Sequence, residues 1–117
     1  MENDKICEDI YSNKKCFLFL NIIFLISGLD IVCEKAGERQ IVSALDVLKK
    51  DSYNIFWMKI RNCVLARIPD YVFLGLEVIH LSIIRSNVSN IDRSSLSALG
   101  GKLDTLDLAN NEIKEVI

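Results

Sequence analysis

The feature that most constrains this chain is an internal repeat, in which apolar residues with the same spacing recur three times after residue 54. The three copies read Ile55-x-x-Met58-x-Ile60-x-x-Cys63-x-Leu65, Val78-x-x-Leu81-x-Ile83-x-x-Ser86-x-Val88 and Leu103-x-x-Leu106-x-Leu108-x-x-Asn111-x-Ile113. Equivalent positions are 23 and 25 residues apart. Such a repeat predicts stacked copies of one supersecondary unit, because a single unit cannot bury its apolar face alone.

The spacing LxxLxLxxN/CxL, with a period of about 20–29 residues, is typical of leucine-rich repeats. In such a unit the LxL core is a short strand whose alternate side chains point inward. The next position turns the chain out of the strand, and a polar side chain there bonds backbone groups that the turn leaves unpaired. We therefore expect an α/β fold, a short solenoid of parallel strands with irregular or short helical return segments. The alternative is an ordinary α/β domain with coincidental spacing.

The register of the repeats also predicts which side chains do what. Cys63, Ser86 and Asn111 take the turn positions, and we call them the ladder residues. Leu81 and Leu106 are expected in the shared core. The side chains expected on the concave strand surface, which solenoids use for binding, are Trp57, Lys59, Arg61, His80, Ser82, Ile84, Thr105, Asp107 and Ala109. An alternative role for Trp57 is to cover the end of the sheet against the preceding cap.

An uncharged apolar segment of fourteen residues, 16–29, follows Lys14 and Lys15. A signal-peptide core needs roughly 7–15 apolar residues, and a membrane span needs about 20. The sequence thus predicts an apolar signal helix within a signal peptide at residues 1–28. A signal anchor that continues to Cys33 and a buried core helix are the alternatives. Residues 1–15 carry four acids, which is unusual before a signal core, so a start codon placed too far upstream is also open.

The expected domains follow in order along the chain. Residues 29–54 form an N-terminal cap region, where Ser43 is expected to cap a short helix that ends at Lys49 and Lys50. The repeats occupy residues 55–77, 78–102 and 103–117. The third repeat stops before its return segment, which predicts a fragment of a longer protein or a truncated gene product.

Composition and cysteine usage exclude several classes of protein. Fourteen Lys and Arg against sixteen Asp and Glu exclude a basic nucleic-acid footprint, and 50% hydrophobic residues exclude intrinsic disorder. The four cysteines fit neither a paired CxxC zinc framework nor a dense disulfide scaffold. After signal cleavage only Cys33 and Cys63 would remain, and whether they pair is left open. Cys63 is expected to be a buried, unreactive thiol.

Enzymatic motifs are missing from the sequence. It contains neither GxGxxG nor a Walker A motif, and His80 has no Cys or acidic partner at a metal-ligand spacing. Asp104 and Asp107 are interpreted as solvated surface residues. We therefore expect no catalytic, cofactor-binding or metal site. Asn87-Val88-Ser89 is an N-glycosylation sequon, and the register places Asn87 just outside the strand.

Three segments resemble secreted arthropod leucine-rich repeat proteins, and they read IPDYVFLGL (residues 68–76), SNVSNIDRSSLSALGGKL (86–103) and LDLANNEIKEV (106–116). They are similar to the group named as the non-catalytic subunit of Oplophorus-luciferin 2-monooxygenase, and more distantly to Slit and Toll ectodomains. The resemblance covers about residues 33–117. It implies a secreted, disulfide-containing binding or accessory protein without catalytic residues. The cap departs from the family, because Cys33 stands without the usual cysteine cluster.

The sequence as a whole thus predicts an extracellular protein-binding module that is not an enzyme. Its expected partner is a protein, with no nucleic acid and no cofactor. A non-catalytic accessory subunit of a secreted enzyme complex is one alternative. A small membrane-anchored leucine-rich repeat protein is the other, and it requires the N-terminal segment to remain uncleaved as an anchor.

Overall fold

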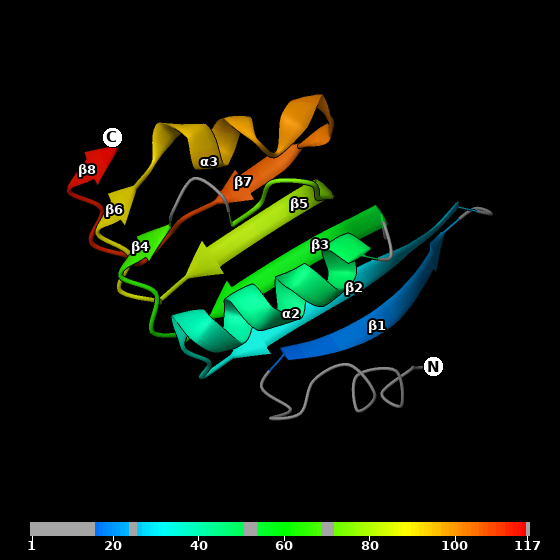
Figure 1. The fold of residues 1–117 in the computed structure, drawn as a ribbon, viewed down its shortest axis with the longest axis horizontal. Coiled ribbons are helices and arrows are strands. Elements are labelled where there is room, and N and C mark those ends of the chain that lie inside the picture. Colours follow the sequence, from blue (N-terminus) through cyan, green and yellow to red (C-terminus); the bar gives the residue numbers. More distant parts are fainter. Residues whose placement is uncertain (1–15, 24–25, 51–53, 69–71, 117) are drawn as a thin grey trace.

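The computed structural model describes residues 16–23, 26–50, 54–68 and 72–116 (Figure 1). Their largest element is a five-stranded sheet. Its strands lie in the order β1 (Cys16–Ile23), β2 (Ile26–Glu34), β3 (Asn54–Arg61), β5 (Glu77–Ile84) and β7 (Thr105–Asp107). β1 is antiparallel to β2, and the other neighbours are parallel. The fold is therefore a mixed α/β arrangement around a mixed sheet.

A second, smaller sheet lies beyond one end of the long strands (left in Figure 1). It consists of β4 (Arg67–Ile68), β6 (Asn90–Ile91) and β8 (Glu115–Val116), paired in parallel. The short helices α3 (Arg93–Ser97) and η1 (Gly100–Lys102) connect β6 to β7. Each parallel strand of the large sheet from β3 onward is thus followed by one strand of the small sheet.

Helix α2 (Glu38–Lys50) connects β2 to β3 and covers one face of the large sheet (Figure 1). Its apolar side is buried through Ile41, Ala44, Leu45 and Leu48. These side chains share one core with the inward residues of the strands. The opposite face of the sheet is left without a helix among the described residues.

The start of α2 differs from the prediction that Ser43 caps it. The helix begins at Glu38, and Ser43 is an exposed residue inside it. The Gln40 Oε1 atom accepts a hydrogen bond from the Gly37 amide at 2.9 Å, and the Gly37 carbonyl accepts one from the Ile41 amide at 3.1 Å. A side chain three residues into the helix thus bonds the residue before it, as in half of a capping box. The helix ends at Lys50, close to the predicted end.

The apolar N-terminal segment contributes residues 16–23 to β1, and residues 1–15 lie outside the described part of the chain. Cys16 lies directly opposite Cys33 in the β1–β2 register, and the two form a disulfide. Cleavage after residue 28 would remove β1 and Cys16 from the mature protein. That cleavage stays a prediction. A search of the described residues for a helix long and apolar enough to span a bilayer finds none.

Leu106 is less buried than the repeat pattern predicts. It pairs with Leu81 across β5 and β7, yet Leu106 is 43% exposed whereas Leu81 is 0% exposed. The reason is its place in the sheet. Among the described strands β7 pairs only with β5, whereas β5 has a neighbour on both sides.

Candidate binding face

The uncovered side of the large sheet begins with an irregularity in β3. Ile55 and Met58 are both buried although two residues separate them, so the strict alternation of a strand is interrupted there. The pairing of β2 with β3 shifts register at the same place. As a result Phe56 and Trp57 are both half-buried, and both contact the ring of His80. We call this side of the sheet the strand face.

The first row across the strand face joins Trp57, His80 and Thr105, which lie opposite one another in the register of β3, β5 and β7. The Trp57 and His80 rings are stacked, with centroids 4.5 Å apart and an interplanar angle of 26°. Phe56 meets the His80 ring edge-on at 5.0 Å. The His80 Nδ1 atom lies 2.7 Å from the Thr105 hydroxyl. His80 is therefore held on three sides by strand-face side chains.

The second row joins Lys59, Ser82 and Asp107. The Lys59 Nζ atom lies 5.1 Å from the centroid of the Trp57 ring, within the range of a cation–π contact. Asp107 is exposed, and its carboxylate accepts a hydrogen bond from the Ala109 amide at 3.0 Å. This row presents charges of both signs to the solvent.

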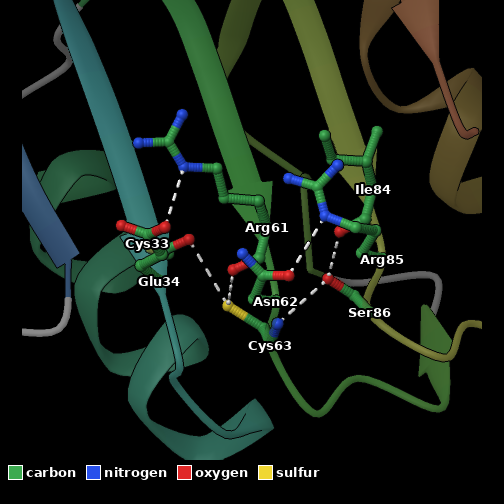
Figure 2. Close-up of polar contacts among 8 residues, drawn as sticks. All are labelled: Cys33, Glu34, Arg61, Asn62, Cys63, Ile84, Arg85 and Ser86. Atoms are coloured by element: carbon green, nitrogen blue, oxygen red, sulfur yellow. Dashed lines mark hydrogen bonds and ion pairs between the residues drawn. The ribbon is translucent and has the colours of Figure 1, made fainter. Parts of the chain in front are cut away.

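The third row contains Arg61, Ile84 and Ala109. Arg61 and Ile84 are paired, and the Ala109 carbonyl accepts a hydrogen bond from the Arg85 amide next to Ile84 at 3.4 Å. The Arg61 guanidinium forms an ion pair with Glu34, with 3.2 Å between Nε and Oε2 (Figure 2). The structure thus places all nine of the residues expected on the concave surface on or at the end of one sheet face.

Strand β2 extends each row by one residue that the sequence reasoning missed. Asp30, Val32 and Glu34 lie opposite Trp57, Lys59 and Arg61 in the parallel β2–β3 register. The repeat pattern does not reveal them, because it begins at Ile55 and the sequence predicts a cap for residues 29–54 rather than a strand of the sheet. The signal that could have found them is the alternation of Leu29, Ile31 and Cys33, which are all buried.

The ladder residues connect the turns that follow successive strands. The Ser86 hydroxyl accepts a hydrogen bond from the Cys63 amide at 3.2 Å (Figure 2). In the same way the Asn111 Oδ1 atom accepts bonds from the Ser86 amide at 2.9 Å and the Val88 amide at 3.2 Å. The Asn111 Nδ2 group donates to the Ile83 carbonyl at 2.7 Å. The Ser86 and Asn111 side chains thus each bond the backbone of the turn before their own.

Cys63 is a buried free thiol, and it is not paired with Cys33, which bonds Cys16. Its Sγ atom donates toward the Cys33 carbonyl at 3.4 Å and the Arg61 carbonyl at 3.3 Å (Figure 2). Burial raises the pKa of the Cys63 thiol, because a thiolate there would lose its hydration. The thiol is therefore protonated, and a poor nucleophile, near neutral pH.

A left-handed residue stands directly before each turn position. Asn62, Arg85 and Asn110, which precede the three ladder residues, have φ angles of 54°, 49° and 60°. Lys35 has a φ of 56° at the same place after β2, before Ala36. The turn after β2 therefore has the geometry of the later turns. This relation is not visible in the sequence, because lysine and arginine are not residues that favour positive φ.

The remaining candidate residues lie outside the strand face. Asn87 is exposed in the turn after Ser86, with a φ of 56°. Asp104 is exposed and directly precedes β7. A search of the described residues for three or more His, Cys, Asp or Glu side chains that could hold a metal ion finds no such group.

No protein-family model matches the chain, and comparisons with curated proteins and with solved structures find no match. The functional interpretation consequently depends on the geometry of the strand face and of the ladder residues.

Proposed function

We propose that this protein is an extracellular protein-binding module, built on a short leucine-rich repeat solenoid, that binds its partner with the strand face and catalyses no reaction. The proposal is supported by the parallel register of β3, β5 and β7, in which residues 23 and 25 positions apart along the chain lie side by side. Stacked repeats use such an extended strand surface for binding. α2 packs on the other side of the sheet and leaves this surface accessible.

The single observation that carries the proposal is the cluster formed by Trp57, His80, Phe56 and Lys59 in the middle of the strand face. Tryptophan and other aromatic residues are enriched at protein interfaces, because they contribute a large contact area at a low entropic cost. The neighbouring rows supply Asp107, an exposed acid, and the Arg61–Glu34 ion pair. An apolar centre surrounded by charges of both signs is the composition expected of a protein-binding surface.

The experiment compares two charge reversals in the tagged protein, exposed to native secretions. Lys59→Glu changes the strand face, and the matched control Arg39→Glu changes an exposed residue of α2. We expect the wild type and Arg39→Glu to retain the same co-purifying protein and Lys59→Glu to lose it. Circular dichroism should show that both variants are folded. Retention of the partner by Lys59→Glu, or its loss from both variants, would contradict binding through the strand face.

The identity of the co-purifying protein distinguishes the alternative functions. A co-purifying oxidoreductase or other secreted enzyme would favour an accessory subunit over a recognition module. N-terminal sequencing of expressed protein tests the compartment. A mature N-terminus near residue 29 in the medium supports secretion, whereas an intact Met1 in the membrane fraction supports an anchored form.

A further inference from the structure

A sequon and an exposed apolar side chain lie together on the turn edge of the molecule, away from the strand face. Asn87 belongs to the single N-x-S/T sequon of the sequence. Val64 is 69% exposed and is the most exposed of the large apolar side chains described. The two residues take the same position in successive turns, since each directly follows a ladder residue, Ser86 or Cys63.

Hydrogen bonds on both sides of Val64 hold it next to the Asn87 turn. The Cys63 amide donates to the Ser86 hydroxyl at 3.2 Å, and the Leu65 amide donates to the Ser86 carbonyl at 3.2 Å. Val64 is therefore flanked by two residues that both bond the immediate neighbour of Asn87. An exposed valine in this place is a surface that a group attached to Asn87 could cover.

The backbone of the sequon is itself held in place. The Ser86 and Val88 amides both donate to Asn111 Oδ1, so the residues on each side of Asn87 are fixed while its own side chain is exposed. Ser89 donates from its amide and its hydroxyl to the Ala66 carbonyl, at 2.9 and 3.2 Å. The fold can thus carry a bulky group on Asn87 without displacing a core residue.

We propose that Asn87 carries an N-linked glycan and that this glycan covers Val64. The donor is an oligosaccharide linked through pyrophosphate to a lipid. A bond forms between the Asn87 amide nitrogen and C1 of the first N-acetylglucosamine, and the bond from C1 to the pyrophosphate oxygen breaks. The amide nitrogen loses one proton and the lipid pyrophosphate leaves, so no oxidant or reductant is needed. The proposal rests on the extracellular location that the proposed function requires.

The first experiment tests the modification in insect cells, with the native chain and with the chain preceded by a signal peptide from an unrelated secreted protein. We expect the second form to show one slower band that an endoglycosidase removes. Asn87→Asp should abolish the band, because aspartate tolerates positive φ but accepts no glycan, whereas Ser89→Thr should retain it. If the chain that carries the unrelated signal peptide shows no slower band, the proposal is overturned. If the chain with the unrelated signal peptide is modified and the native chain is not, the result supports Asn87 as a glycosylation site and counts against the extracellular function.

The second experiment tests whether the glycan covers Val64. Asn87→Asp protein should self-associate more than the glycosylated wild type in sedimentation at increasing concentration, because Val64 is then bare. Adding Val64→Ser to the Asn87→Asp protein should lower its self-association to the level of the wild type. Val64→Ser alone should not change the self-association of the glycosylated protein. Equal self-association of Asn87→Asp with and without Val64→Ser would show that the glycan does not cover Val64.

Discussion

The second and third repeats have the same apolar spacing but differ in how far they bury it. Leu81 in β5 and Leu106 in β7 are register partners, and their exposed fractions are 0% and 43%. Val88 and Ile113 follow the ladder residues Ser86 and Asn111, and their exposed fractions are 0% and 37%. The comparison teaches that the repeat pattern decides which way a side chain points, whereas how deeply it is buried depends on what packs against its repeat. Among the described strands, β5 has a neighbour on both sides and β7 has only β5.

The largest effect is expected from placing a charge at each of the two equivalent leucines. Leu81→Asp buries an unpaired carboxylate in the shared core and should leave no cooperative unfolding transition. Leu106→Asp places the charge at a partly solvated edge and should lower the free energy of unfolding by only about 1 kcal/mol. Urea denaturation followed by circular dichroism measures both. Similar losses in the two variants would show that the two repeats are equally buried.

A second comparison removes the two ladder side chains. Asn111→Ala should destabilise the protein by about 2–3 kcal/mol, because it leaves the Ser86 and Val88 amides and the Ile83 carbonyl without this partner. Ser86→Ala removes the acceptor of only the Cys63 amide and should cost about 1 kcal/mol. Thermal unfolding of the purified variants gives the order. A larger loss for Ser86→Ala would mean that the turn after β5 depends more on its ladder residue than the turn after β7 does.

The buried thiol of Cys63, in the turn after β3, makes the stability of the protein depend on pH. Its folded-state pKa is raised by burial, so the native state retains a proton that the unfolded thiol loses above about pH 8.5. The stabilisation is fully present below that value and is lost as the pH rises through the folded pKa. Cys63→Ser should remove this alkaline loss of stability, measured by urea unfolding from pH 7 to 10. A wild type and variant with the same pH dependence would contradict a buried thiol.

The smallest effect on stability is expected from the surface ion pair between β5 and η1. Lys102 and Glu77 form an ion pair at 3.2 Å, and both side chains are exposed. Lys102→Ala should change the free energy of unfolding by less than about 0.5 kcal/mol, because solvent and salt screen such a pair. Urea unfolding at low and high salt measures the difference. A loss as large as that of Asn111→Ala would mean that the ion pair at the start of β5 stabilises the fold as much as the ladder residue after β7 does.

Much of the candidate site could be read from spacing. Positions 57, 59 and 61 alternate with inward residues, and a shift of 23 residues leads to His80, Ser82 and Ile84. Strand alternation is a local property, so it can be read before any fold is known. The spacing Ile55-x-x-Met58 also leaves Phe56 outside the inward positions, and β5 repeats the same break at Val78 and Leu81. The contact of Phe56 with the His80 ring could not be read from spacing, because it depends on how β3 lies beside β5.

The sequence by itself determined the inward positions of the repeats, such as Val78, Leu81 and Ile83, and the polar turn residues that follow them. Apolar periodicity and turn chemistry act between residues close in the chain. Only the tertiary structure decided that β2 lies beside β3, that Cys16 pairs with Cys33, and that Leu106 lies at an edge. These depend on which distant segments meet, and a local pattern does not specify what lies on the other side of a strand.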